Sequence, residues 1–228
     1  MSVLRADPPA GNRVNGAMAG TPDKVSASPL TTLELVLPAE RAREFFLLFQ
    51  QGVMVPARAG CTLEQLLVEQ WGVDSDYVTR RITTIFLDGR PVDDVKTALV
   101  RVGAVLALSG AMPGLVGATM RRGGFYAAMR GGISYQESMA SGSDQVTPVR
   151  LKLFNLLLPE LVPGFLLRGI VLTDSQLAEL LEGVSEAFWE GIAACRCNGV
   201  TLDPAQLRHG GCRTGNILLT VLFEDGEP

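Results

Sequence analysis

The sequence has little of what enzyme chemistry usually requires. It contains one histidine, and it has neither a Gly-x-Ser-x-Gly elbow nor a His-Glu-x-x-His helix motif. Its Gly-rich stretch at 114–124 lacks the Gly-Lys-Ser/Thr step with which a phosphate loop holds phosphate and magnesium. Whether the chain is an enzyme therefore stays open on the sequence, and a non-catalytic role is favoured.

Positive charge is also scarce. The chain has 20 Lys and Arg against 24 Asp and Glu, which gives a net charge of −4. Binding nucleic acid by bulk attraction needs a basic face that displaces counterions, so we expect no nucleic-acid partner. Residues 1–20 contain no continuous apolar stretch of the length that a secretory signal needs, so the predicted location is cytoplasmic.

Cysteine is sparse, at four residues in a chain of 228 that is 47% apolar and able to build its own core. No disulfide is predicted, because a chain of this size does not need staples. Three of the cysteines and the histidine nevertheless form a Cys-x-Cys and His-x-x-Cys cluster, Cys195, Cys197, His209 and Cys212. Thiolates with one imidazole would suit tetrahedral zinc; the alternative is buried thiols and no cofactor.

The chain divides into two apolar-patterned blocks. Residues 1–30 are rich in Pro, Gly, Ala and Ser and are predicted to be a disordered tail. The first unit spans 31–112, a Gly-rich connector spans 113–148, and the second unit spans 149–228. The uncharged stretch at 102–120 is long enough to cross a bilayer, but its glycines, proline and hydroxyls favour a buried strand running into a loop. No membrane contact is expected.

The order of signals in the first block recurs in the second, 110 to 112 positions later. Thr62 and Thr173 each open a leucine-rich stretch that ends at glycine, which predicts helices over 62–72 and 173–183. Asp-Gly at 88–89 and Asn-Gly at 198–199 predict hairpin turns. Strands are predicted at 33–38 and 149–155, at 52–58 and 164–172, before the two turns, and at 102–110 and 214–226.

This order resembles the β-grasp fold of ubiquitin and of the sulfur carriers of thiamine and molybdopterin synthesis. The stretch that carries the resemblance best is TTIFLDGRPVDDVKTALVRVGAVLAL at 83–108, with its strand, Asp-Gly turn, polar loop and closing strand. We therefore expect an α+β protein made of two tandem β-grasp-like units, each a mixed sheet packed on one helix. In the repeat, Cys195 and Cys197 align with Ile85 and Leu87, which favours buried thiols over metal ligands.

Ubiquitin-like carriers act through a C-terminal Gly-Gly, whereas this chain ends Glu-Asp-Gly-Glu-Pro. Carrier chemistry would therefore require cleavage after a glycine pair of the connector, so the candidate tail residues are Gly123, Gly124, Gly131 and Gly132. The neighbouring arginines could instead hold a small anionic ligand or substrate, through Arg121, Arg122 and Arg130. The third interpretation is a plain flexible joint.

The function that the sequence favours is a non-catalytic protein-interaction or accessory module, since a ubiquitin-like unit offers sheet faces and edges to a partner. The alternative is a sulfur-carrier-related, thiol or metal-binding protein that uses the processed glycine tail or the cysteine cluster. A protein partner is expected, and the oligomeric state, homo-oligomers included, is left open.

Overall fold

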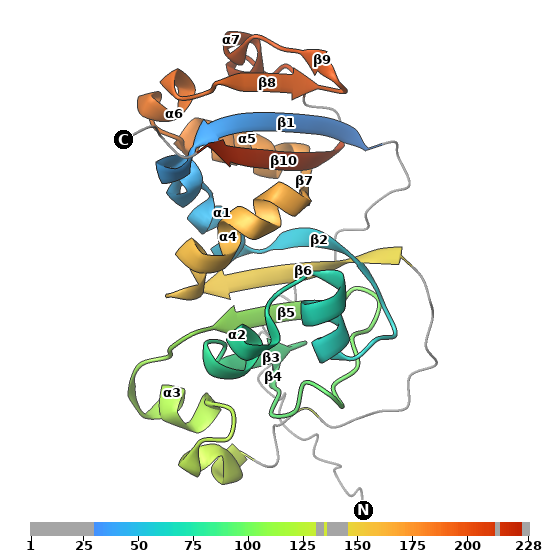
Figure 1. Cartoon of the computed structure of the whole chain (residues 1–228), viewed down its shortest axis with the longest axis vertical. Helices are drawn as coiled ribbons and strands as arrows, with labels where there is room; N and C mark the ends of the chain where they lie inside the picture. Colours follow the sequence, from blue (N-terminus) through green and yellow to red (C-terminus); the bar gives the residue numbers. More distant parts are fainter. Residues whose placement is uncertain (1–29, 131–134, 136–145, 213–214, 225–228) are drawn as a thin grey trace, which may run out of the picture.

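The strands of the structure form one mixed sheet. The computed structural model describes residues 30–130, 135, 146–212 and 215–224 and places their ten strands in the order β4-β3-β5-β6-β2-β7-β10-β1-β8-β9 (Figure 1). The strands are β1 (Thr31–Pro38), β2 (Val53–Arg58), β3 (Thr84–Leu87), β4 (Arg90–Pro91), β5 (Val105–Ser109), β6 (Val146–Phe154), β7 (Ile170–Thr173), β8 (Ala194–Cys197), β9 (Val200–Thr201) and β10 (Asn216–Glu224). The expected α+β class with a mixed sheet is confirmed.

Helices follow the strands in a repeated order. The first segment has η1 (Ala39–Phe45), α1 (Phe46–Gln51), η2 (Gln65–Gln70) and α2 (Ser75–Arg80). The second has α4 (Leu157–Arg168), α5 (Asp174–Gly183), α6 (Glu186–Glu190) and α7 (Pro204–Arg208), and the connector has α3 (Gly114–Met120) and η3 (Phe125–Arg130). Within the described residues, no helix is both long and apolar enough to cross a membrane.

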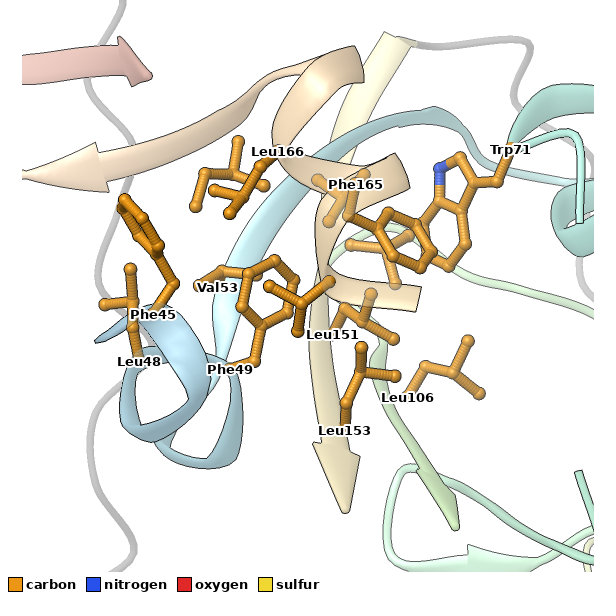
Figure 2. Packing of buried hydrophobic residues seen from close by; sticks show 14 of the residues in the cluster. Phe45, Leu48, Phe49, Val53, Trp71, Leu106, Leu151, Leu153, Phe165 and Leu166 are labelled. Carbon is orange, nitrogen blue, oxygen red and sulfur yellow. The ribbon is translucent and has the colours of Figure 1, made fainter. Parts of the chain in front are cut away.

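Alternate strand residues build the core on one face of the sheet. Buried leucines and valines recur at every second position of the long strands, as Leu33, Leu35 and Leu37 on β1 and Val149, Leu151 and Leu153 on β6. Helices cover this face: α4 packs against β10 and β6, and α1 packs against β6 and α4 (Figure 1). Aromatic contacts join the segments, with the rings of Trp71 and Phe165 5.3 Å apart (Figure 2). One hydrophobic cluster therefore spans both halves of the chain.

The predicted helix starts and hairpin turns are confirmed. Thr62 and Gln65 form a reciprocal cap, in which the Gln65 N–H donates to Thr62 Oγ1 at 3.2 Å, and Thr173 forms the same box with Gln176. At the turns, Asp88 and Asn198 both have a φ of 51°, and the glycines that follow have φ of 76° and 77°. These are left-handed conformations that Asp, Asn and Gly tolerate, so the local sequence determines both hairpins.

The prediction of a strand over 164–172 is wrong in its first half. Residues up to Arg168 belong to α4, and β7 begins only at Ile170. Pro163 and Gly164 resemble a break in the sequence, yet Leu158, Val162 and Phe165 have helical spacing and are buried. Burial of that apolar face offsets the poor helix propensity of the two residues. The matching helices over 39–51 were not predicted either.

The first strand of each segment lies in the half of the sheet that the other segment builds. β1 pairs in parallel with β10 and antiparallel with β8, whereas β6 pairs in parallel with β5 and antiparallel with β2. The helices that follow these strands carry the chain across the centre, where Met54 of β2 is paired with Val171 of β7. Strand pairing thus crosses the predicted boundaries at 112 and 149, and the two segments share one sheet.

Candidate functional site

The cysteine cluster contains a disulfide, so the prediction of no bridge is wrong. Cys197 of β8 is bonded to Cys212, which lies 15 positions later in the sequence, and their Cα atoms are 5.8 Å apart. Helix α7 starts at a capping box on Asp203 and turns the chain back toward β8. This return, which spacing alone does not reveal, brings the two thiols within bonding geometry.

The proposed zinc ligands do not form a ligand set in this structure. Cys197 and Cys212 are bonded to each other, and His209 is exposed at the end of α7. Cys195 is buried in the core, and burial raises the pKa of its thiol to about 11, so it is neutral at pH 7. The described residues contain no group of three or more His, Cys, Asp or Glu side chains that could hold a metal ion.

Two of the three arginines predicted to bind an anion contact the chain itself. Arg122 donates from its guanidinium to the backbone oxygens of Val78 and Ile82, and desolvation by burial lowers its pKa. Arg130 is 4% exposed and pairs with the carboxylate of Asp93. These contacts attach the connector helices to the first segment.

The third arginine and the glycine pairs have different surroundings. Arg121 is exposed, and its carbonyl accepts a hydrogen bond from the Gly124 N–H at 3.2 Å. Gly123 has a φ of 59°, in a tight turn between α3 and η3. Gly131 and Gly132 lie outside the described residues. The glycine pair at 123–124 therefore belongs to an ordered turn between two short helices. Arg122, just before it, is fixed to the first segment through both its backbone N–H and its guanidinium.

The sheet face opposite the core is exposed. No described helix packs on it, and most of its strand positions remain partly or fully accessible, for example at Glu34, Arg58 and Leu222. The outward residues Thr84, Ser109 and Val171 are buried. On β2, β3, β5 and β6 these outward positions include three cations and no acid. The cations are Arg58, Arg150 and Lys152. Their side chains form no hydrogen bond or ion pair with the described residues.

An apolar cavity opens at the end of the β5 and β6 strands, beside these cations. Its volume is ≈ 280 Å³. Its lining comes from strands and from the loop before α3: Phe86, Ala107, Leu108, Ser109, Met112, Pro113, Phe154 and Asn155. Ala107 is the register partner of Lys152, so the cavity and the nearest cation are on neighbouring strands.

Sequence reasoning missed this surface although one signal was available. The run VRLKLF at 149–154 alternates apolar and basic residues, which predicts a strand with both cations on its outer face. The alternation does not tell which strands flank it. The neighbours of Arg150 and Lys152 are set by the exchange of β6 into the first half of the sheet.

A second cavity, of ≈ 220 Å³, lies on the helical side between α4 and the residues that follow η2. Its polar rim is largely paired already: Tyr77 donates to Glu160, and Arg81 contacts the same carboxylate. Hydrogen bonds from Arg81 and Tyr77 lower the pKa of Glu160, and burial raises the pKa of Tyr77. This cluster joins α2 to α4 and has a structural explanation.

Comparisons with protein-family models, with curated proteins and with solved structures find no match for this chain.

Proposed function

We propose that this chain is a non-catalytic protein-interaction or accessory module that docks a partner on the open face of its sheet. The observation that carries the proposal is the asymmetry of the two faces. One face is buried under helices, and the other presents, beside an apolar cavity, cations that form no ion pair with the part of the chain that the structure describes. Surfaces that combine an apolar pocket with polar groups around it are typical of binding sites.

The outer edges of the sheet suit docking less well. They are β4 and β9, each only two residues long. Short edge strands offer few unpaired backbone groups and are one way in which proteins avoid strand addition. The partner is therefore expected to contact side chains of the face rather than extend the sheet.

The connector adds a further apolar surface. The side chains of Leu115, Phe125 and Met129 on α3 and η3 are 72%, 91% and 76% exposed. The two helices contact each other, and exposed apolar side chains that gather in one place mark interaction sites. Their exposure supports an interaction role for the chain as a whole.

We also propose that the two halves are ubiquitin-like units, each of which takes up the first strand of the other segment. β6 lies beside β2 as a first strand would, whereas β1 lies beside β8 in the place of a closing strand. Each half contains an outer hairpin, a central parallel pair and an inner antiparallel strand, in the orders β4-β3-β5-β6-β2 and β9-β8-β1-β10-β7. The matched caps at Thr62 and Thr173 and the matched turns at Asp88 and Asn198 support a duplication. A duplicated unit gives two related surfaces on one sheet.

The test is site-specific photo-crosslinking in the native host. A photoreactive residue is placed at Ala107 or Leu222 on the open face, and at the exposed Leu47 or Leu167 on the helical side as matched controls. The proposal predicts that a protein partner is crosslinked from the open-face positions and not from the controls. Crosslinks from Leu47 and Leu167 alone, or none from the open face, would refute it.

A further inference from the structure

The two halves of the sheet contain an internal comparison for the cations on the open face. Gly52 and Gly169 occupy equivalent places at the start of β2 and β7, with φ of 114° and 102°. A Cβ built on Gly52 would lie 3.1 Å from Lys152 Cε and 3.3 Å from Arg150 Cγ. Side chains of the neighbouring strand β6 therefore lie over this glycine.

Different residues occupy the same places in the second half. A Cβ built on Gly169 would lie 3.1 Å from Leu218 Cδ1 and 3.4 Å from Thr220 Oγ1. Leu218 and Thr220 of β10 thus cover Gly169 as Arg150 and Lys152 cover Gly52. Because uncharged residues satisfy this packing, the fold does not require the positive charges of the first half.

The two halves also differ in the charge of the residues that lie beside their cations on neighbouring strands. In the second half, Arg196 and Thr220 both flank Glu34 in register, so a cation lies beside an acid. In the first half the equivalent row is Phe86, Ala107 and Lys152, which contains no acid. The charge of Lys152 is therefore left without a neighbour of opposite sign on the sheet.

The dimensions of the site suit an extended peptide. Phe154 lines the cavity, and Arg150 is four residues earlier on the same strand, a span of about 13 Å. A ligand that contacts the cations and fills the cavity must extend over this length, which about four residues of extended chain would cover. The cavity volume of ≈ 280 Å³ is enough for one large apolar side chain of such a peptide.

We infer that the first half of the open face binds an acidic segment of a partner protein. Carboxylates of the segment pair with Arg150 and Lys152, and an apolar side chain two to four positions away enters the cavity. The inference rests on the proposed interaction function and adds the chemistry of the partner. The second half, with Leu218 and Thr220 at the equivalent positions, does not bind this segment.

The probe is a set of synthetic peptides of about eight residues, in which two glutamates are followed two to four positions later by leucine, phenylalanine or tryptophan. Binding to the full chain is measured by fluorescence anisotropy at low salt. Members of the set are expected to bind with a Kd below about 1 mM and to weaken as salt rises. If no member binds, or if glutamine versions bind equally well, the inference is wrong.

The decisive variant carries Arg150→Leu and Lys152→Thr, the residues that the chain itself uses over Gly169. It should keep its melting temperature and lose about tenfold or more in affinity. The double variant Arg150→Gln and Lys152→Gln, which keeps longer stems over Gly52, provides the same test if the first does not fold. Unchanged affinity in a folded variant would overturn the inference.

Two further variants locate the binding. Ala107→Leu, which adds bulk to the cavity, should weaken binding, whereas Arg196→Leu on the same face of the second half should not. If the chain binds peptides only after residues 1–29 are removed, its own N-terminal segment competes for the site. That result would contradict the inference that the site binds a partner protein. Crosslinking from the open face combined with failure of every peptide would leave the proposed function standing and reject only the acidic segment.

Discussion

Asn198 accepts a hydrogen bond on its side-chain oxygen from the backbone N–H of Thr32, which lies 166 positions earlier in the chain. In the other half, Asp88 accepts the equivalent bond from Val105 at 2.8 Å. Val105 begins the strand that closes its own segment, whereas Thr32 belongs to the first strand of the other segment. β1 thus takes the place of a closing strand beside β8.

The exchange predicts that neither segment folds alone. A chain cut between Met139 and Ala140 should give two fragments that each lack a cooperative unfolding transition, because each lacks a central strand of its half-sheet. Mixed in equal amounts, they should recover the far-ultraviolet circular dichroism of the whole chain. A fragment that unfolds cooperatively by itself would argue against obligatory exchange.

The disulfide predicts a redox-dependent stability. Replacing both Cys197 and Cys212 by serine should lower the free energy of unfolding by ~3 kcal/mol, the chain-entropy value for a loop of about this length. Denaturant unfolding without reductant measures the difference in the free energy of unfolding between parent and variant. Reductant should abolish this difference, because it lowers the stability of the parent protein to that of the variant. Cys61→Ser is the control, since Cys61 is not in the bridge; it should leave the response to reductant intact.

The buried arginine of the connector predicts a structural rather than a ligand-binding defect. Arg130→Lys should lower the free energy of unfolding by about 1–3 kcal/mol, because lysine cannot reproduce the planar donors that reach Asp93 and the Thr119 carbonyl. Arg121→Lys, at an exposed position, should change stability by less than about 0.5 kcal/mol. Urea unfolding compares the two. Equal stability of both variants would indicate that Arg130 is not needed to hold the connector.

The hydrogen bonds that join α2 to α4 predict a weak dependence of stability on pH in the acid range. Hydrogen bonds from Arg81 and Tyr77 lower the folded-state pKa of Glu160, so its contribution is present above the unfolded pKa of about 4.3 and is lost as pH falls through the lower folded pKa. Glu160→Gln should therefore flatten the decline of stability between about pH 5 and 3. Glu182→Gln, at an exposed site on α5, is the control; an equal effect from both variants would exclude a specific role for Glu160.

Local signals made part of the fold predictable. The Thr-x-x-Gln boxes at Thr62 and Thr173 and the turns at Asp88 and Asn198 depend on contacts between near neighbours, so the sequence contains them. The helix through Pro163 depends on burial against the other segment, which overrides local propensity.

The candidate surface required long-range information. Alternation identifies the outward residues of β6, but the exchange decides that Ala107 and Gly52 lie beside Lys152. The disulfide had the same limit, because the return of the chain through α7 sets the distance between Cys197 and Cys212. In both cases the sequence pattern identifies the residues, but their spatial neighbours depend on long-range contacts that the pattern does not predict.

The most direct test of docking on the open face is a methyl nuclear magnetic resonance titration of the full chain with the tightest acidic peptide. The account predicts that methyl signals of Met54, Val105 and Ala107 shift together and saturate, while those of Leu47 and Leu167 on the helical side stay in place. Shifts confined to Leu47 and Leu167 would contradict it.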